Sequence, residues 1–158
     1  MPDLHHNPLK TNGFEFVEFT GDTDHLKRLF GNMGFSAVAK HKDKDITLYR
    51  QGKVSVFLNA EAAGQAGDFA AAHGMGPNAM AFVVADAKIA HAEALKAGAE
   101  DASDMAHSGL LASKGIGGSL LYFADNLNFY EEAFEFTSED RNPAGFGMTY
   151  IDHLTHNV

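Results

Sequence analysis

The chain has 158 residues, of which 45% are hydrophobic and 21% charged, so it is long enough to form one domain with a buried core. It contains no cysteine, which excludes a disulfide framework, a cysteine zinc site and thiol catalysis and fits a reducing, cytoplasmic compartment. The formal net charge of -9 and the absence of a basic cluster argue against a nucleic-acid partner, and no apolar run approaches the roughly 20 residues of a membrane span.

The first half of the chain alternates strand-like and helix-like patterns. The aromatic and β-branched run 13–19 predicts a strand. The apolar residues of 26–33 recur at intervals of three and four, which predicts a helix that is capped by Asp22, Thr23 or Asp24 and ends near Gly34. Alternation with period two then predicts three strands, at 36–41, 46–50 and 54–58. The resulting order is β-α-β-β-β.

The second half repeats this order about 63 residues further on, after a helix predicted at 60–73. The patterns predict a strand at 79–86, a helix at 87–97 and strands at 110–113 and 119–124, the last two joined by a glycine-rich hairpin turn. The aromatic and acidic run 129–136 is interpreted as core packing between the two halves, with a subunit contact as the alternative. Residues 137–149 are polar and predict a linker.

Paired βαβββ units are typical of the vicinal oxygen chelate superfamily, and within it the sequence resembles the N-terminal part of the 4-hydroxyphenylpyruvate dioxygenase family. The resemblance is carried by NPLKTNGFEFVEF, LYRQG, AMAFVVAD, KGIGGSLLYFAD and the final IDHLTHNV. It implies an α+β fold of two βαβββ modules with mixed curved sheets. It also implies a non-catalytic domain at 1–136 (modules about 13–74 and 78–136), a linker at 137–149, and at 150–158 the first strand of a truncated catalytic domain.

The resemblance implies that the longer parent protein oxidises 4-hydroxyphenylpyruvate, a 2-oxo acid, to homogentisate with O2 and a non-heme Fe(II) in tyrosine catabolism. It implies that His153 is the first iron ligand, provided that the missing catalytic domain is present. His156 would point to the opposite face of a regular strand, so we prefer His153. This chain alone is expected to be inactive, without bound iron and without catalytic or cofactor-binding residues of its own.

Aligning the two modules with the IDHLTHNV motif places Phe16, Ala79 and Tyr122 at the positions where the family's catalytic domain holds its metal. None of these three residues completes a triad of two histidines and one carboxylate. We therefore expect a metal-free sheet whose concave face is filled by side chains such as Phe16 and Tyr122.

Two other functions are kept as alternatives. The chain could be a free-standing small-molecule binding or oligomerisation module of the same superfamily, or a fragment of a 4-hydroxymandelate synthase, which shares the architecture. In every case we expect a homo-oligomer, because unpaired apolar edges favour self-association.

Several polar residues are interpreted as surface positions. Glu15 and Glu18 lie three apart on one strand and are read as solvated edge charges rather than as an acid–base pair. Six histidines without a second ligand at metal spacing are also assigned to the surface; they are His5, His6, His25, His73, His91 and His107.

Overall fold

The structure is a computed structural model and describes residues 6–155 of the chain. Its first half has the predicted order of one strand, one helix and three strands. These elements are β1 (Thr11–Thr20), α1 (Thr23–Asn32), β2 (Ser36–His41), β3 (Ile46–Gln51) and β4 (Val54–Asn59). Helix α1 begins where the sequence predicts, because the Asp22 carboxylate accepts a hydrogen bond of 2.9 Å from the backbone N–H of His25.

The second half follows the same order with one strand reduced. After α2 (Gly64–His73) come β5 (Gly76–Val84), α3 (Ala87–Lys96), β6 (Leu111–Lys114), a 3-10 turn at Ile116–Gly118 and β7 (Leu120–Ala124). A complete βαβββ order requires a further strand before β6, and within the described residues it is reduced to a single bridge between Asp101 and Ser113. The Asp101 carboxylate accepts from the backbone N–H of Ser103 at 3.0 Å, and this local turn ends the pairing after one bridge.

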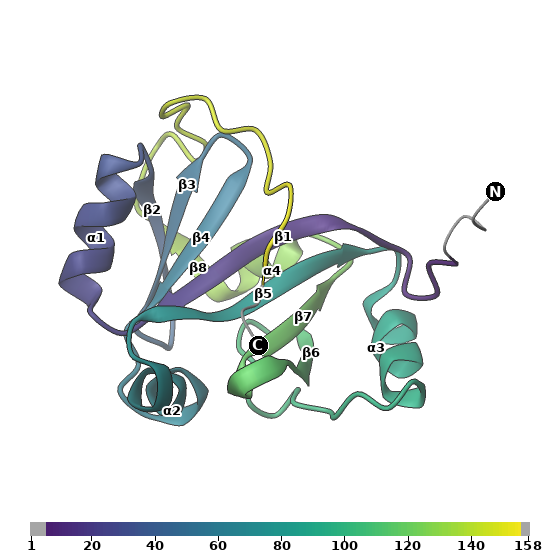
Figure 1. Cartoon of the computed structure of the whole chain (residues 1–158). Helices are drawn as coiled ribbons and strands as arrows, with labels where there is room; N and C mark the ends of the chain where they lie inside the picture. The colour runs from purple at the N-terminus through teal and green to yellow at the C-terminus, as the bar shows by residue number, and fades with distance from the viewer. Residues whose placement is uncertain (1–5, 156–158) are drawn as a thin grey trace.

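The strands form one curved, mixed sheet, which confirms the predicted α+β fold class (Figure 1). With β8 (Phe134–Phe136), the strand order is β6-β7-β5-β1-β4-β3-β2-β8. Strands β1 and β5, the first strands of the two halves, pair antiparallel at its centre, where Phe16 lies opposite Ala81 and Glu18 opposite Ala79. Each of them also pairs in parallel with the last strand of its own half, β4 and β7. The duplication therefore closes the inner edges of both halves against each other.

The core lies on both faces of this sheet. Alternate side chains of β4 separate the two faces, because Phe57 joins one cluster and its neighbours Val56 and Leu58 join another. The Phe57 cluster also contains Phe16 and fills the concave face. On the other face, α1 covers the first half and α3 covers the second.

The segment 129–136 packs the two halves together, as predicted. It consists of α4 (Asn128–Ala133) and β8, and it buries Phe129, Tyr130 and Phe134 in the concave-face cluster. Although β8 follows the second half in the chain, it pairs antiparallel with β2 of the first half. Residues far apart in the sequence therefore complete one edge of the sheet.

The remaining part of the chain, residues 137–155, has no regular secondary structure and runs back over the β3–β4 hairpin and down one face of the sheet (Figure 1). Residues 150–155 form no strand here, and residues 156–158, with His156, lie outside the described residues. That 150–158 opens a catalytic domain stays a prediction.

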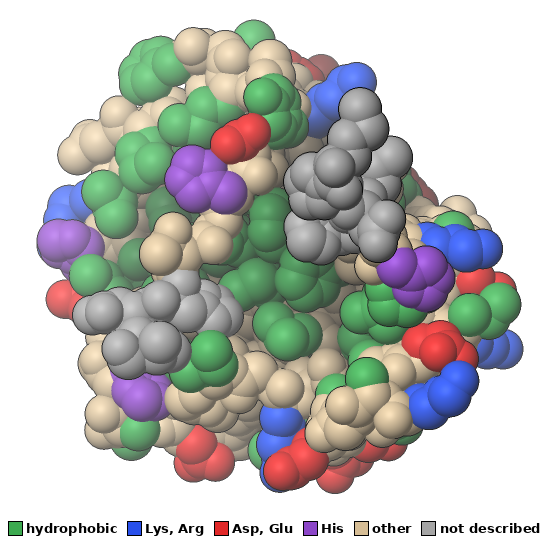
Figure 2. Space-filling view, turned by 45° about the vertical axis from the view of Figure 1, so that its right-hand side comes forward, with side chains coloured by type: hydrophobic (Ala, Val, Ile, Leu, Met, Phe, Trp, Pro, Cys, Tyr) green, Lys and Arg blue, Asp and Glu red, His purple; other side chains and the backbone are tan. Residues whose placement is uncertain are grey.

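Figure 2 shows one face of the molecule, with hydrophobic side chains gathered in its middle and charged side chains toward its rim. Among the large hydrophobic residues exposed to solvent are Phe146, Met148 and Tyr150, all from the irregular C-terminal part. None of the helices in residues 6–155 has the length and hydropathy needed to cross a bilayer.

Candidate functional site

Side chains fill the concave face at the three positions that the sequence alignment matched to the family's metal ligands. Phe16, Ala79 and Tyr122 are at most 1% exposed, and the rings of Phe16 and Tyr122 lie 5.5 Å apart. The ring of Phe57 contacts Phe16 as well, with centroids 4.4 Å apart. This confirms that side chains fill the face.

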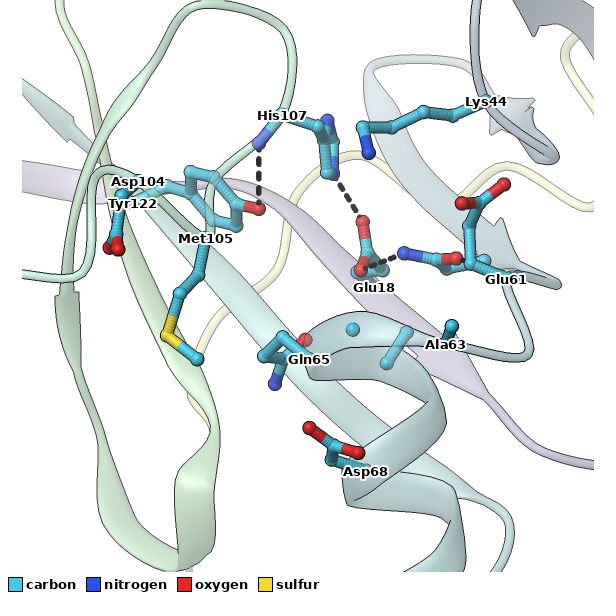
Figure 3. A pocket seen from close by; sticks show the side chains of 13 residues that line it. Glu18, Lys44, Glu61, Ala63, Gln65, Asp68, Asp104, Met105, His107 and Tyr122 are labelled. Carbon is cyan, nitrogen blue, oxygen red and sulfur yellow. Dashed lines mark hydrogen bonds and ion pairs between the residues drawn. The ribbon is translucent and has the colours of Figure 1, made fainter.

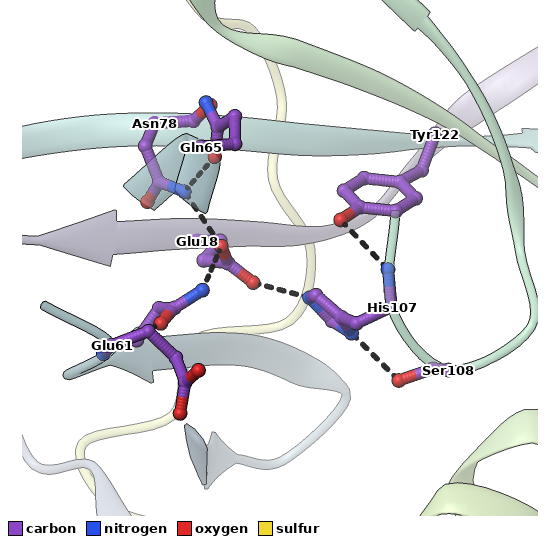
Figure 4. Close-up of polar contacts among 8 residues, drawn as sticks. Glu18, Glu61, Gln65, Asn78, His107, Ser108 and Tyr122 are labelled. Carbon is purple, nitrogen blue, oxygen red and sulfur yellow. Dashed lines mark hydrogen bonds and ion pairs between the residues drawn. The ribbon is translucent and has the colours of Figure 1, made fainter. Parts of the chain in front are cut away.

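A buried carboxylate and imidazole lie at one end of this aromatic cluster (Figure 4). The Nε2 of His107 is 2.5 Å from the Oε2 of Glu18, and the two side chains are only 4% and 1% exposed. Glu18 reaches this position because it lies two residues after Phe16 on β1 and so shares its face of the sheet. His107 comes from the loop that precedes β6.

Three amides complete the surroundings of Glu18. Its Oε1 accepts from the Nδ2 of Asn59 at 2.9 Å and from the Nδ2 of Asn78 at 2.6 Å. The same Asn78 nitrogen donates to the Oε1 of Gln65, and the Nε2 of Gln65 donates to backbone oxygens of Asn78 and Gly118. The network thus joins β1, β4, α2 and β5 around one carboxylate.

The network decides the protonation of Glu18. Burial alone would raise its pKa, but the adjacent His107 and the hydrogen bonds from His107, Asn59 and Asn78 outweigh burial and lower the pKa below its ordinary value. Burial and the nearby Glu18 charge raise the pKa of Tyr122 well above its ordinary value, so its hydroxyl is a neutral group at neutral pH. Glu18 is therefore an ionised, fully hydrogen-bonded carboxylate.

A cavity of about 300 Å³ opens beside this pair (Figure 3). Lys44 and Glu61 lie on one side of it, and Asp104 and Met105 lie on the other. A carboxylate–imidazole pair can relay a proton in principle. Here both side chains are engaged with each other and with neighbours, so the arrangement first of all ties the His107 loop to the sheet.

The surface assignment of two histidines and one glutamate is wrong. Glu18, His91 and His107 are buried, whereas Glu15 is half-buried. Period-two alternation after Phe16 is the sequence signal that would have placed Glu18 inside. No periodic element contains His107, so no such signal exists for its burial.

The other histidines of that set divide differently. His6, His25 and His73 are exposed as predicted, and His5 lies outside the described residues. Glu15 and Glu18 line different cavities, which agrees with the prediction that they do not act on one substrate together.

His153, the iron ligand that the family resemblance implies, is not among the residues that line this cavity. Its side chain is 79% exposed, and its Nδ1 is 2.8 Å from the Oδ2 of Asp152. Among residues 6–155 no group of three or more histidine, aspartate or glutamate side chains is arranged to hold a metal ion. The donors described here therefore do not fit a two-histidine, one-carboxylate iron site.

Comparison with known proteins identifies the family. The family model described as "Hydroxyphenylpyruvate dioxygenase, HPPD, N-terminal" matches residues 5–139. The chain belongs to this family.

Relatives of hydroxyphenylpyruvate dioxygenase type match over almost the whole chain. The 4-hydroxyphenylpyruvate dioxygenase of Pseudomonas aeruginosa is 43% identical over 97% of this chain, and that of Legionella pneumophila is 44% identical over 96%. These matches cover only 46% and 44% of the relatives, so the chain spans less than half the length of the curated relatives it matches. Among solved structures, a xylose isomerase-like TIM barrel/4-hydroxyphenylpyruvate dioxygenase fusion protein matches 88% of this chain with a TM-score of 0.76 and 27% identity, over 24% of its own length.

Proposed function

We propose that the chain is the N-terminal, non-catalytic domain of a longer Fe(II)-dependent dioxygenase that converts 4-hydroxyphenylpyruvate to homogentisate. The observation that carries this proposal is the packing of aromatic side chains on the concave face. Phe16, Phe57 and Tyr122 pack against one another where an open, donor-lined cavity would be needed for a metal and a 2-oxo acid.

The lengths of the relatives support the same division of roles. The matched dioxygenases are about twice as long as this chain, and the family model that matches describes an N-terminal domain. In such a protein His153 would supply one ligand, and the other ligands would come from residues outside this chain. Bound Fe(II) would supply the activation of O2. The cytoplasmic location and the homo-oligomer stay predictions.

The proposal is tested with two proteins. The 158-residue chain, supplied with Fe(II), ascorbate and 4-hydroxyphenylpyruvate, should consume O2 no faster than buffer. A chimera in which this chain replaces the matched N-terminal part of the Pseudomonas aeruginosa dioxygenase should bind iron and turn over the same substrate.

Two results would contradict the proposal. Turnover by the short chain would place the active site within it. A chimera that folds, by circular dichroism, and keeps its iron content after His153→Ala would remove His153 from the metal centre. His25→Ala in the same chimera is the matched control, since it removes an exposed imidazole on helix α1.

A further inference from the structure

The segment 143–148 is docked onto the first half of the fold, although its composition is that of a linker. We call it the exit arm, because it leads to the segment that contains His153. The backbone N–H of Gly52, in the β3–β4 turn, donates to the carbonyl oxygen of Pro143 at 2.7 Å. The backbone N–H groups of Phe146 and Met148 donate to the Oε1 of Gln51 at 2.6 and 3.3 Å.

Gln51 is the centre of this contact. It is 0% exposed, and its Nε2 donates to the carbonyl oxygen of Met33 at 2.8 Å. Met33 caps the C-terminal end of α1. A single buried amide therefore ties together α1, the end of β3 and the exit arm, with its oxygen accepting two hydrogen bonds and its nitrogen donating one.

Three glycines provide the space for this docking. Gly34, Gly52 and Gly145 all have positive φ angles, of +87°, +56° and +52°. A Cβ atom on Gly34 would lie 2.9 Å from the ring of Phe146, one on Gly52 would lie 2.9 Å from the carbonyl oxygen of Met148, and one on Gly145 would lie 2.5 Å from the Cγ of Gln51. Side chains at these positions would be strained and would push the exit arm away.

We propose that Gln51 is a positioning residue, which with Gly34, Gly52 and Gly145 forms a clasp that holds the exit arm and sets the direction in which the chain enters the His153 segment. The contact continues beyond the arm, since Ile151 packs against the cluster of Leu26 and Phe30. The effect on a metal centre rests on the proposed function, because only there is His153 a ligand. The clasp itself does not depend on it.

The clasp is tested in the 158-residue chain by hydrogen exchange and by spin labels. Gln51→Met keeps the length of the side chain and removes its hydrogen bonds, so the amides of Phe146 and Met148 should exchange at least about tenfold faster. The chain contains no cysteine, which allows labels at Lys27→Cys on α1 and Tyr150→Cys beyond the arm without further changes. Gln51→Met should broaden the single narrow distance distribution between them.

Gln65→Met is the matched control. Gln65 also donates to two backbone oxygens, but it lies on α2 and contacts no residue of the exit arm. This variant should leave both measurements at their wild-type values. Gly145→Ala keeps the Gln51 amide but places a methyl group against its side chain, so it should also displace the arm and reproduce the effects of Gln51→Met. Unchanged exchange and an unchanged distance distribution in Gly145→Ala and Gln51→Met would overturn the clasp.

The positioning role is tested in the chimera. Gln51→Met should weaken Fe(II) binding about tenfold, measured by chelator competition, while Gln65→Met should not. A loosened arm with wild-type iron affinity would overturn the positioning role and leave the proposed function intact. An iron content that does not change in His153→Ala would instead overturn the proposed function. The clasp would still be tested by the hydrogen-exchange and spin-label measurements.

Discussion

Two glutamates of β1, three residues apart, lie in opposite surroundings. Glu18 lies on the concave face, fully buried and hydrogen-bonded to His107, Asn59 and Asn78. Glu15, three residues earlier, is half-buried at the edge of a separate cavity of about 800 Å³. There its Oε1 accepts from the hydroxyl of Tyr130 at 2.8 Å.

The surroundings give the two carboxyl groups opposite pKa shifts. Burial raises the pKa of Glu15, and the Tyr130 hydrogen bond and the Arg50 charge do not offset it. The pKa of Glu18 is lowered despite greater burial, because the electrostatic interaction with His107 and the hydrogen bonds from His107, Asn59 and Asn78 outweigh burial. The comparison teaches that the groups facing a carboxylate, rather than its depth alone, decide which form the fold favours.

The largest expected effect comes from removing the partner of Glu18. His107→Leu removes one partner of a buried pair and leaves the Glu18 charge without it, so the free energy of unfolding at pH 7 should fall by about 3–5 kcal/mol. Adding Glu18→Gln should recover part of this loss, because no charge then remains buried. Urea unfolding followed by circular dichroism measures both.

His91→Leu is the control for that prediction. His91 is also buried, but the carboxylate it contacts, Asp101, is largely exposed, so its loss should cost only about 1 kcal/mol. Equal losses for the two histidine variants would contradict the special role assigned to the Glu18–His107 pair.

A smaller expected effect is the opposite pH dependence of the stability that Glu18 and Glu15 contribute. The stabilisation from Glu18 is complete above its unfolded-state pKa of about 4.3 and is lost as the pH falls through its lower folded-state pKa. Glu15, whose folded-state pKa is raised, stabilises the fold increasingly as the pH falls through that pKa toward about 4.3.

Urea midpoints from pH 7 to pH 3 should show these opposite trends. Glu18→Gln should destabilise the protein by about 1–3 kcal/mol at pH 7, and its difference from wild type should shrink in acid. Glu15→Gln should change stability by less than about 0.5 kcal/mol at pH 7 and should become comparatively less stable in acid. A common trend for both variants would contradict the opposite pKa shifts.

A further small effect concerns the hydrogen bond to Glu15 alone. Tyr130→Phe removes the hydroxyl that donates to Glu15 and keeps the buried ring, so the free energy of unfolding should fall by about 1 kcal/mol. Tyr150→Phe, at an exposed tyrosine, should have no effect in the same thermal or urea unfolding experiment. A loss as large as that of His107→Leu would mean that the surroundings of Glu15 and Glu18 contribute equally to stability.

Much of this fold was predictable because its signals are local. Strand β2 has the bounds that alternation predicted, and α1 begins after Asp22 because that side chain caps it. The filling of the concave face was also predicted from sequence, since aligning the modules with the family's metal motif placed Phe16 and Tyr122, two bulky side chains, at the positions of metal ligands. These features depend on residue spacing within one element or one repeat.

The polar site was less predictable because its partners come from distant segments. Glu18 could have been placed inside from its spacing to Phe16, but its partner His107 belongs to an irregular loop 89 residues away. Gln51 is the last residue of β3, and its sequence position gives no signal that its side chain is buried. Its burial appears only when residues 146 and 148 return to it, 95 and 97 residues later.

The sequence by itself determined the order of most helices and strands, the internal repeat and the family resemblance, because each depends on the spacing and type of neighbouring residues. Only the tertiary structure decided that Glu18 is ionised in the interior and that residues 143–148 are held in place. Both outcomes depend on hydrogen bonds between segments that are far apart in the sequence and adjacent only in the folded sheet. No local sequence pattern predicts such long-range contacts.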